Sequence, residues 1–338
     1  MSSEGRVVSV NVSADKGTVK HPAPEIAITD RGVEGDAHAG PWHRQVSLLS
    51  IERIEAFSER AGRKITHGEF AENITTSGID IGGVALMDRF TIGPGEFAEN
   101  ITTRGLDLGE IGLLDRLTVG EAELEVTQIG KACHGAECAI FREVGECLMP
   151  KEGLFCRVLA GGTVRPGDTI EHVPRALRFW IVTLSDRAYR GEYGDRSGPR
   201  IREMLEEFLD GKRWHPRIKS VLLPDEPDKL CSELVAARDQ GVDVVFTTGG
   251  TGVGPRDFTP ETVAGVCDKL IPGVMEHIRA KYGAANPNAL LSRSVAGVAG
   301  TTLIYALPGS VRAVEEYVGE IVTTIEHLIT TVHGLETH

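Results

Sequence analysis

Two patterns of hydrophobic and polar positions divide the chain near residues 173–175. Before this point, short stretches of alternating apolar and polar residues are separated by glycines, as in GEAELEVTQI (120–129). After it, apolar runs of strand length alternate with amphipathic segments of helical period. The first pattern predicts a mainly β domain over residues 1–174, built as a β-barrel. The second predicts an α/β domain over residues 175–338, with a mostly parallel sheet covered by helices.

The second pattern predicts individual elements. We expect strands over 178–184, 217–224, 242–248 and 301–307, and helices over 199–210, 227–240, 261–283 and 310–334. The apolar runs suit strands that are buried on both faces of a sheet. In such a sheet the ligand site lies beyond the carboxyl ends of the strands, so the residues that follow each strand are the first candidates for function.

The first half contains one predicted helix and one repeat. Ile51, Ile54 and Phe57 fall on one face of the helix predicted over 50–62. Residues 68–94 are followed directly by a copy at 95–121, with 17 of 27 positions identical. Two copies are too few for a solenoid, so we interpret the repeat as a local duplication. Only one copy fits one place in a barrel, and the sequence leaves open which copy that is.

Composition narrows the class of protein. The chain has 338 residues, of which 41% are hydrophobic and 25% charged, as expected for a globular protein of two domains. It has no apolar run of membrane-spanning length and no secretory signal, so we expect a cytoplasmic protein without a membrane partner. With 36 Lys and Arg against 49 Asp and Glu, the net charge is −13, which argues against nucleic acid as the main partner.

Polar residues follow the predicted strands of the second half. Ser185, Asp186, Asp195 and Ser197 follow the first strand. The run TTGGTGVGPRDFTPE (247–261) follows the third, and its glycines allow backbone N–H groups to turn toward an anion. This run lacks the Gly-Lys-Ser/Thr ending of a nucleotide P-loop, and an ordinary loop is the alternative interpretation.

Two aspartates are the candidate metal ligands. Asp225 follows the second predicted strand, and Asp257 lies within the glycine-rich run. Mg²⁺ prefers one or two carboxylates together with substrate phosphate oxygens, and it stabilises charge during phosphoryl or nucleotidyl transfer. The alternative is that each aspartate caps a helix or a turn. The other candidate substrate-binding residues are Gly249, Gly250, Thr251, Gly252, Ser292, Pro308, Gly309 and Ser310. Arg293 is of a type that binds an anionic group, and a solvated arginine on a helix is the alternative.

Residues 178–335 resemble the molybdopterin adenylyltransferase family of the MogA/MoaB type. The matching motifs are SD at 185–186, DRSGP at 195–199, PDE at 224–226, TTGGTG at 247–252, RDFTPE at 256–261 and LPGS at 307–310. The resemblance implies that Mg²⁺, ATP and molybdopterin bind, that AMP is transferred to the terminal phosphate of the pterin, and that pyrophosphate leaves. It implies that Asp225 and Asp257 are the catalytic, metal-holding residues. Family members are commonly trimers, so it also implies a homo-oligomer.

The cysteines are concentrated in the first half, at Cys133, Cys138, Cys147 and Cys156. They lack the close pairs of a zinc site, and without a secretory signal disulfides are disfavoured. Cys156 is expected to be a buried, inert thiol. Cys133 lies in the sequence KACH, where a nearby positive charge would lower its pKa and increase its reactivity.

A glycine-rich stretch at 32–50 contains Asp36, His38 and His43. A metal site on the two histidines has no evident third ligand, so a loop with surface histidines is the favoured interpretation.

Residues 5–173 resemble the MOSC domain, the C-terminal module of molybdenum-cofactor sulfurases. The resemblance rests on GVEGDAHAG with RQVSLL, on GEFAENITT, on the cysteine of KACH and on GGTVRPGD. It implies a β-rich fold that binds the pterin cofactor and carries sulfur on Cys133, with Cys138 as the second candidate. It also implies a sulfur donor and molybdate-insertion proteins as partners. The family has a single GEFAENITT element, so the duplication puts the barrel register in question.

Both resemblances converge on one ligand. We therefore expect an enzyme of molybdenum cofactor biosynthesis, in which an adenylyltransferase is fused to a MOSC domain that binds the cofactor or carries sulfur. The alternative is a carrier that holds molybdopterin or the molybdenum cofactor without catalysis. ATP-dependent release of pyrophosphate distinguishes the two.

Overall fold

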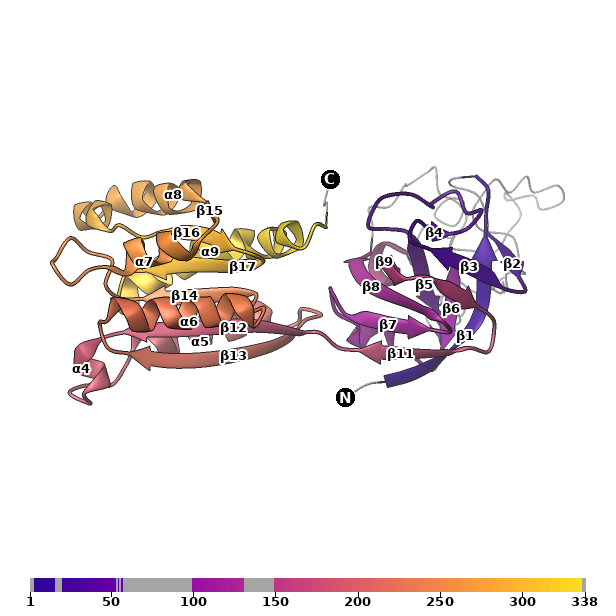
Figure 1. The fold of residues 1–338 in the computed structure, drawn as a ribbon, viewed down its shortest axis with the longest axis horizontal. Coiled ribbons are helices and arrows are strands. Elements are labelled where there is room, and N and C mark those ends of the chain that lie inside the picture. Colours follow the sequence, from indigo (N-terminus) through magenta and orange to yellow (C-terminus); the bar gives the residue numbers. More distant parts are fainter. Residues whose placement is uncertain are drawn as a thin grey trace, which may run out of the picture. The chain divides into compact units, whose positions relative to one another are not determined.

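The computed structural model describes residues 3–15, 20–52, 54, 56, 99–130 and 149–335. The chain divides into two compact units, Met1–Arg175 and Ala176–His338, and Figure 1 labels most of their elements. Among the described residues, no helix combines the length and the apolar composition that crossing a membrane requires.

The first unit is built on a closed β-barrel. Seven strands pair in the order β11-β7-β8-β9-β5-β6-β1, and β11 pairs with β1 to close the circle. All of these pairs are antiparallel except β5–β6. The interior is filled by apolar side chains such as Val10, Leu48, Ile101 and Leu124. The barrel strands are β1 (Ser3–Val12), β5 (Val46–Ser50), β6 (Ile101–Arg104), β7 (Arg116–Val119), β8 (Ala122–Ile129), β9 (Leu154–Ala160) and β11 (Thr169–Val173).

Shorter elements complete this unit. Strand β2 (His21–Ala23) pairs with the end of β1, and β10, β3 and β4 form a small separate sheet. Their bounds are β3 (Ile26–Thr29), β4 (Gly32–Val33) and β10 (Gly162–Val164), with a 3-10 helix η2 (Leu108–Glu110) and a short helix α3 (Met149–Glu152).

The second copy of the repeat supplies two barrel strands. Strand β6 comes from this copy and pairs with both β1 and β5, and Ile101, Thr102 and Thr103 are buried in it. Strand β7 comes from the same copy. The first copy, 68–94, lies outside the described residues. Of the helix predicted over 50–62, residues 51, 52, 54 and 56 are helical, and the rest lies outside the described residues.

The second unit contains a six-stranded sheet in the order β13-β12-β14-β17-β16-β15. Strands β13, β12, β14 and β17 are parallel to one another, whereas β16 and β15 are antiparallel to their neighbours. The bounds are β12 (Ala176–Leu184), β13 (His215–Leu223), β14 (Val244–Thr248), β15 (Lys269–Leu270), β16 (Ala296–Ala299) and β17 (Thr302–Leu307). The carboxyl ends of the four parallel strands therefore meet along one edge of the sheet.

Helices cover both faces of this sheet (Figure 1). Helices α6 and α7 pack on the face that carries Trp180, Val182 and Leu184, and α5 and α9 pack together against the other face. The helices are α4 (Asp186–Tyr189), α5 (Ser197–Leu209), α6 (Pro227–Asp239), α7 (Thr259–Val266), α8 (Pro272–Gly283) and α9 (Val311–Val332), with a 3-10 helix η4 (Pro287–Leu291).

One prediction for this unit is wrong: residues 261–283 do not form a single helix. The chain leaves α7 at Cys267 with an extended backbone, forms the short strand β15, and re-enters a helix at Pro272. Proline lacks an N–H and disfavours a helical residue before it, so it suits the start of α8 and not the interior of a longer helix.

Candidate functional site

Three loops of the second unit converge on Gly249, which follows β14. Its N–H donates to the carbonyl oxygen of Leu307 at 3.0 Å, at the end of β17. A methyl group on Gly249 would lie 2.4 Å from the carbonyl oxygen of Leu184, at the end of β12. One at Gly309 would lie 3.4 Å from the Gly249 Cα. The loops after β12, β14 and β17 are therefore in direct contact.

The turn after β14 presents backbone donors. Gly249 and Gly250 have φ values of +110° and +64°, a conformation that favours glycine. In the described part of the chain, the backbone N–H groups of Gly250, Thr251 and Gly252 have no hydrogen-bond acceptor. Consecutive backbone N–H groups in such a turn form an anion-binding concavity. This turn is therefore the candidate phosphate site.

Asp186 and Asp225 lie against each other. The backbone N–H of Asp186 donates to Asp225 Oδ2 at 2.9 Å, and the backbone N–H of Asp225 donates to Asp186 Oδ1 at 3.0 Å. Each carboxylate therefore holds the loop that carries the other, and each keeps its second oxygen for another partner. The structure brings these two acidic groups together, a pairing that the sequence analysis did not predict.

Arg256 contacts the Asp186–Asp225 pair. Its Nη2 forms an ion pair with Asp186 Oδ2 and donates to the backbone oxygen of Asp225 at 3.4 Å. The hydrogen bond from the Asp225 backbone lowers the pKa of Asp186, and Arg256 lowers it further. Because Arg256 directly precedes Asp257, the loop that carries Asp257 contacts both acidic residues.

The Asp257 carboxylate closes its own loop. Its Oδ2 accepts from the Gly254 N–H at 2.7 Å, and a methyl group on Gly252 would lie 2.7 Å from the same oxygen. Arg293 supports this loop, since its guanidinium donates to the backbone oxygens of Gly252 and Asp257, each at 2.6 Å, and pairs with Glu261. Arg293, suggested by the sequence as an anion-binding residue, thus holds the loop in shape.

Asp195 joins the end of β12 to the start of α5. Its carboxylate accepts from Thr183 Oγ1 at 2.7 Å, from Ser197 Oγ at 3.2 Å and from the Gly198 N–H at 3.1 Å. Ser185 caps α4 by accepting from the Ala188 N–H. Asp195 and Ser197 therefore stabilise the loop between β12 and α5.

The remaining predicted site residues flank the turn. Thr251 Oγ1 lies 3.4 Å from Ser292 Oγ, which in turn lies 2.7 Å from Ser294 Oγ. Thr248 Oγ1 donates to the carbonyl oxygen of Pro308 at 2.9 Å, and Ser310 caps α9. Ser292 therefore lies beside the turn that follows β14, and the LPGS loop contacts the end of β14 itself.

The first unit holds a buried charged group that the sequence analysis described only in part. Lys20 Nζ donates to Asp36 Oδ2 at 2.5 Å, and both side chains are at most 1% exposed. The same oxygen accepts from the Ser13 N–H at 3.1 Å and from Asn100 Nδ2 at 3.2 Å. Burial opposes ionisation of Asp36, but its hydrogen bonds with His38 and the charge of Lys20 outweigh burial and hold its pKa far below the usual range.

The other candidate residues of the first unit are its cysteines and two histidines. Cys133, Cys138 and Cys147 lie outside the described residues. Cys156 is buried, and burial raises the pKa of its thiol, as expected for an inert cysteine. In the described part of the chain, His38 and His43 do not belong to any group of three potential metal ligands.

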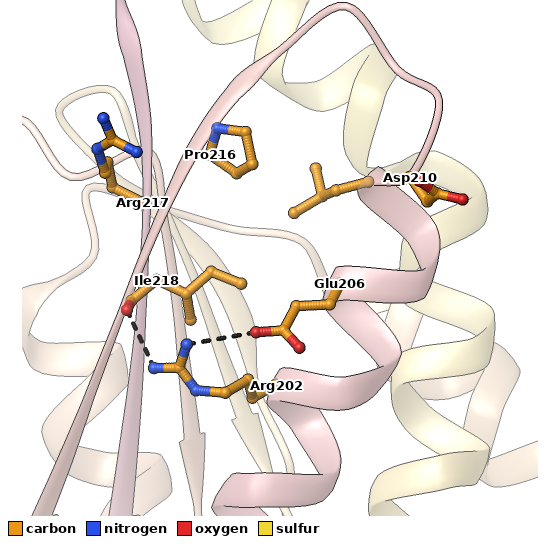
Figure 2. Close-up of a pocket in the computed structure, with 7 residues that line it drawn as sticks. Arg202, Glu206, Asp210, Pro216, Arg217 and Ile218 are labelled. Carbon is orange, nitrogen blue, oxygen red and sulfur yellow. Dashed lines mark hydrogen bonds and ion pairs between the residues drawn. The ribbon is translucent and has the colours of Figure 1, made fainter.

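A cavity of about 420 Å³ lies away from the loops described above, between α5 and the beginning of β13 (Figure 2). Arg202 lies within it and donates to the Ile218 carbonyl oxygen at 3.0 Å and to Ser220 Oγ at 3.1 Å. It also pairs with Glu206 at 3.5 Å. These contacts join α5 to the outermost strand, β13. We therefore interpret the cavity as part of the packing between these two elements and not as a second candidate site.

Two residues of the candidate site are not evident from the sequence. Arg256 stands out there only as part of the RDFTPE motif, and Tyr193, whose hydroxyl lies 2.8 Å from Ser185 Oγ, belongs to no motif. Both make contacts across loops, which a local pattern does not encode.

Known families match both units. A model described as a probable molybdopterin binding domain matches residues 180–327, and a MOSC domain model matches residues 35–96 and 91–171. The molybdopterin adenylyltransferase of Helicobacter pylori (strain J99) is 35% identical over 162 residues, covering 47% of this chain and 90% of that protein. That of Haemophilus influenzae is 37% identical over 143 residues, covering 41% of this chain and 70% of that protein.

A solved structure of MogA is also similar to this chain. It is 37% identical, with 46% of this chain and 99% of the other covered and a TM-score of 0.42. Together with the curated relatives, the family models assign both units. The chain belongs to the molybdopterin adenylyltransferase family through its second unit and carries a MOSC domain in its first.

Proposed function

We propose that the second unit is a molybdopterin adenylyltransferase that works in molybdenum cofactor biosynthesis. In this reaction an oxygen of the terminal phosphate of molybdopterin bonds to the α-phosphorus of ATP, and the bond to the departing pyrophosphate breaks. The observation that carries the proposal is the 35% identity to an enzyme of that name, 90% of which this chain covers.

The acidic residues fit a magnesium ion. Asp186 and Asp225 each use one carboxylate oxygen for the other's backbone N–H, and the second oxygen of Asp186 forms the ion pair with Arg256. A metal ion would therefore bind the second oxygen of Asp225 and compete with Arg256 for that of Asp186. One or two carboxylates with substrate phosphates are the usual ligands of Mg²⁺. When bound there, the ion would neutralise charge on the ATP phosphates. Asp257, which the resemblance pairs with Asp225 as a catalytic, metal-holding residue, lies in the adjoining loop and remains a proposed ligand; its Oδ2 already accepts from the Gly254 N–H.

The chain's own residues would then bind and orient the nucleotide. The N–H groups of Gly250, Thr251 and Gly252 would donate to phosphate oxygens, and the contact between Gly249 and the end of β12 would fix the turn beside Asp186. Donors held in place in this way stabilise charge that develops during transfer, and the loss of one typically lowers the rate by about 10²–10³-fold.

Pyrophosphate release from ATP in the presence of molybdopterin tests the proposal with the full chain. Asp225→Asn keeps an oxygen for the Asp186 N–H but removes the charge, so we expect release to fall by about 10²-fold or more. Glu226→Gln is the matched control, because Glu226 is the neighbouring exposed carboxylate and pairs with Lys229. If the wild-type chain binds molybdopterin without releasing pyrophosphate, the carrier alternative is correct.

We also propose that the MOSC unit binds the molybdenum cofactor and carries sulfur on Cys133. The match of the MOSC model to residues 35–96 and 91–171 supports the cofactor-binding part. Mass spectrometry after incubation with a persulfide donor tests the sulfur-carrying part, because the Cys133 thiolate would take the outer sulfur of the donor and the donor's thiolate would leave. A persulfide on Cys133 that is absent from Cys133→Ser supports the assignment, and a persulfide on Cys138 alone contradicts it.

A further inference from the structure

Arg256 pairs with the acidic residues that are proposed to hold magnesium. Its Nη2 forms an ion pair with Asp186 Oδ2, the carboxylate oxygen that the Asp225 N–H does not use. It also donates to the Asp225 backbone oxygen. The side chain of Arg256 is 66% exposed, whereas that of Asp186 is 16% exposed. The guanidinium therefore lies over the acidic pair from the solvent side.

We propose that Arg256 is a resting counter-ion of the Asp186–Asp225 pair, which a divalent cation displaces and which then binds the nucleotide phosphates. A divalent cation and the guanidinium compete for Asp186 Oδ2, and they repel each other if both are present. Arg256 lies in the segment between the glycine turn and Asp257, so phosphates bound at that turn offer the guanidinium a new anionic partner. This inference rests on the proposed function, because it takes a divalent metal and ATP as ligands of these loops.

The exchange links metal binding to nucleotide binding. A metal ion that binds alone must break the Arg256–Asp186 pair. When nucleotide is already bound, the guanidinium has moved to phosphate and this cost is absent. Arg256 therefore weakens binding of metal alone and strengthens binding of metal-free ATP. By reciprocity, each ligand raises the affinity of the other by the same factor.

The size of the effect follows from the exposure of the pair. Exposed ion pairs are weak, and a factor of about five in affinity is the upper end of what one contributes. The contact also lies beside a second arginine, Arg190, whose Nη1 is 4.0 Å from Asp186 Oδ2 and whose Nε pairs with Glu192 at 2.8 Å. Arg190 is the matched control, since it has the same charge near the same carboxylate but makes its close contact elsewhere.

Two binding measurements on the full chain test this role without catalysis. In the first, Mn²⁺ alone is titrated and free Mn²⁺ is followed by electron paramagnetic resonance. We expect Arg256→Ala to bind Mn²⁺ about fivefold more tightly than the wild type, and Arg190→Ala to change the affinity by less than about twofold. In the second, ATP binding is measured by equilibrium dialysis in EDTA, where we expect Arg256→Ala to bind about threefold or more weakly and Arg256→Lys to retain part of the affinity.

Other outcomes overturn the inference. Mn²⁺ affinity that is unchanged or lower in Arg256→Ala removes the competition, and an equal gain in Arg190→Ala reduces it to a general charge effect. Unchanged metal-free ATP affinity removes the transfer to phosphate. If the wild type releases pyrophosphate but any of these binding results is found, the proposed function is retained and the role of Arg256 is rejected. Conversely, the expected binding changes without any pyrophosphate release would contradict the enzyme and retain the role of Arg256. Thermal unfolding of each variant checks that it is folded.

Discussion

Replacing Lys20 by methionine tests the buried charged group of the barrel unit. The change removes the cation at 2.5 Å from Asp36 but keeps a side chain of similar length in a position that is 1% exposed. Removal of one partner of a buried ion pair typically costs about 3–5 kcal/mol, because a buried charge is left without its counter-ion. Asp36 keeps three donors, the N–H groups of Ser13 and His38 and the amide of Asn100, so we expect about 3 kcal/mol.

A second substitution separates the lost pair from lost packing. In Lys20→Met with Asp36→Asn the buried charge is absent, so we expect the double variant to recover at least about half of the lost stability. If the double variant is as unstable as the single one, the loss comes from packing and the electrostatic reasoning is wrong.

The pH dependence gives an independent check of the same pair. Because the folded-state pKa of Asp36 is lowered, its contribution is fully present above the unfolded value of about 3.9 and is lost as pH falls toward the folded value. Without Lys20 the pKa of Asp36 rises, and protonation then removes the unpaired charge. The deficit of Lys20→Met relative to the wild type should therefore be smaller at pH 4.5 than at pH 7.

Urea unfolding followed by tryptophan fluorescence measures these differences in the barrel unit alone. The chain has three tryptophans, and Trp42 is the one in this unit, so Trp180→Phe and Trp214→Phe leave it as the reporter. A deficit below about 1 kcal/mol at pH 7, or one that does not change with pH, would refute the reasoning about Lys20 and Asp36.

Three further predictions concern the repeat, the glycine turn and the cysteines. Asn100→Ala should destabilise the barrel unit by about 2–3 kcal/mol in urea unfolding, because the buried N–H of Ser47 in β5 and the buried carbonyl oxygen of Asn11 in β1 lose their partner. Asn73→Ala, at the same position of the first copy, should have no comparable effect. Equal losses in the two variants would contradict the assignment of the second copy to the barrel. Gly249→Ala should lower the stability of the second unit by about 1–3 kcal/mol in thermal unfolding, since φ is +110° there, and an unchanged melting temperature would disprove the strain. At pH 8 the exposed Cys231 should react with a thiol reagent much faster than Cys267, because burial and the charge of Asp268 raise the pKa of the Cys267 thiol to about 11. Peptide mass spectrometry measures the two rates of modification. Similar rates would argue against the raised pKa of Cys267.

The sheet of the second unit was predictable where strands form apolar runs. Strands β12, β14 and β17 each lie at a predicted position because most of their residues are buried between the two layers of helices. Strand β13 also lies near its predicted position, although its residues are only half-buried or exposed. Strand β16 (Ala296–Ala299) was not predicted, because its sequence AGVA consists mainly of small residues that give no strong hydrophobic pattern. Strand β13 begins before its prediction and includes Pro216, which an outermost strand tolerates.

The candidate site was predictable in its location but not in its contacts. Asp225 follows β13 and the glycine turn follows β14, and residues that follow parallel strands meet at one edge of the sheet. The pairing of Asp225 with Asp186 joins residues 39 apart, and the contact of Arg256 with Asp186 depends on how two loops pack. Likewise, Lys20 finds Asp36 only inside the folded barrel unit. Such contacts follow from tertiary packing, which hydrophobic periodicity does not report.

The outermost strand β13 is poorly suited to growth by strand addition. Pro216 has no backbone N–H to donate, and the carbonyl oxygen of Ile218 already accepts a hydrogen bond from the Arg202 guanidinium. A neighbouring chain that approached this edge would find an interrupted row of hydrogen-bonding groups. Self-association of the second unit should accordingly use helix or loop surfaces. The β13 edge, where another parallel strand could otherwise add to the sheet, is thereby protected against fibrillar aggregation.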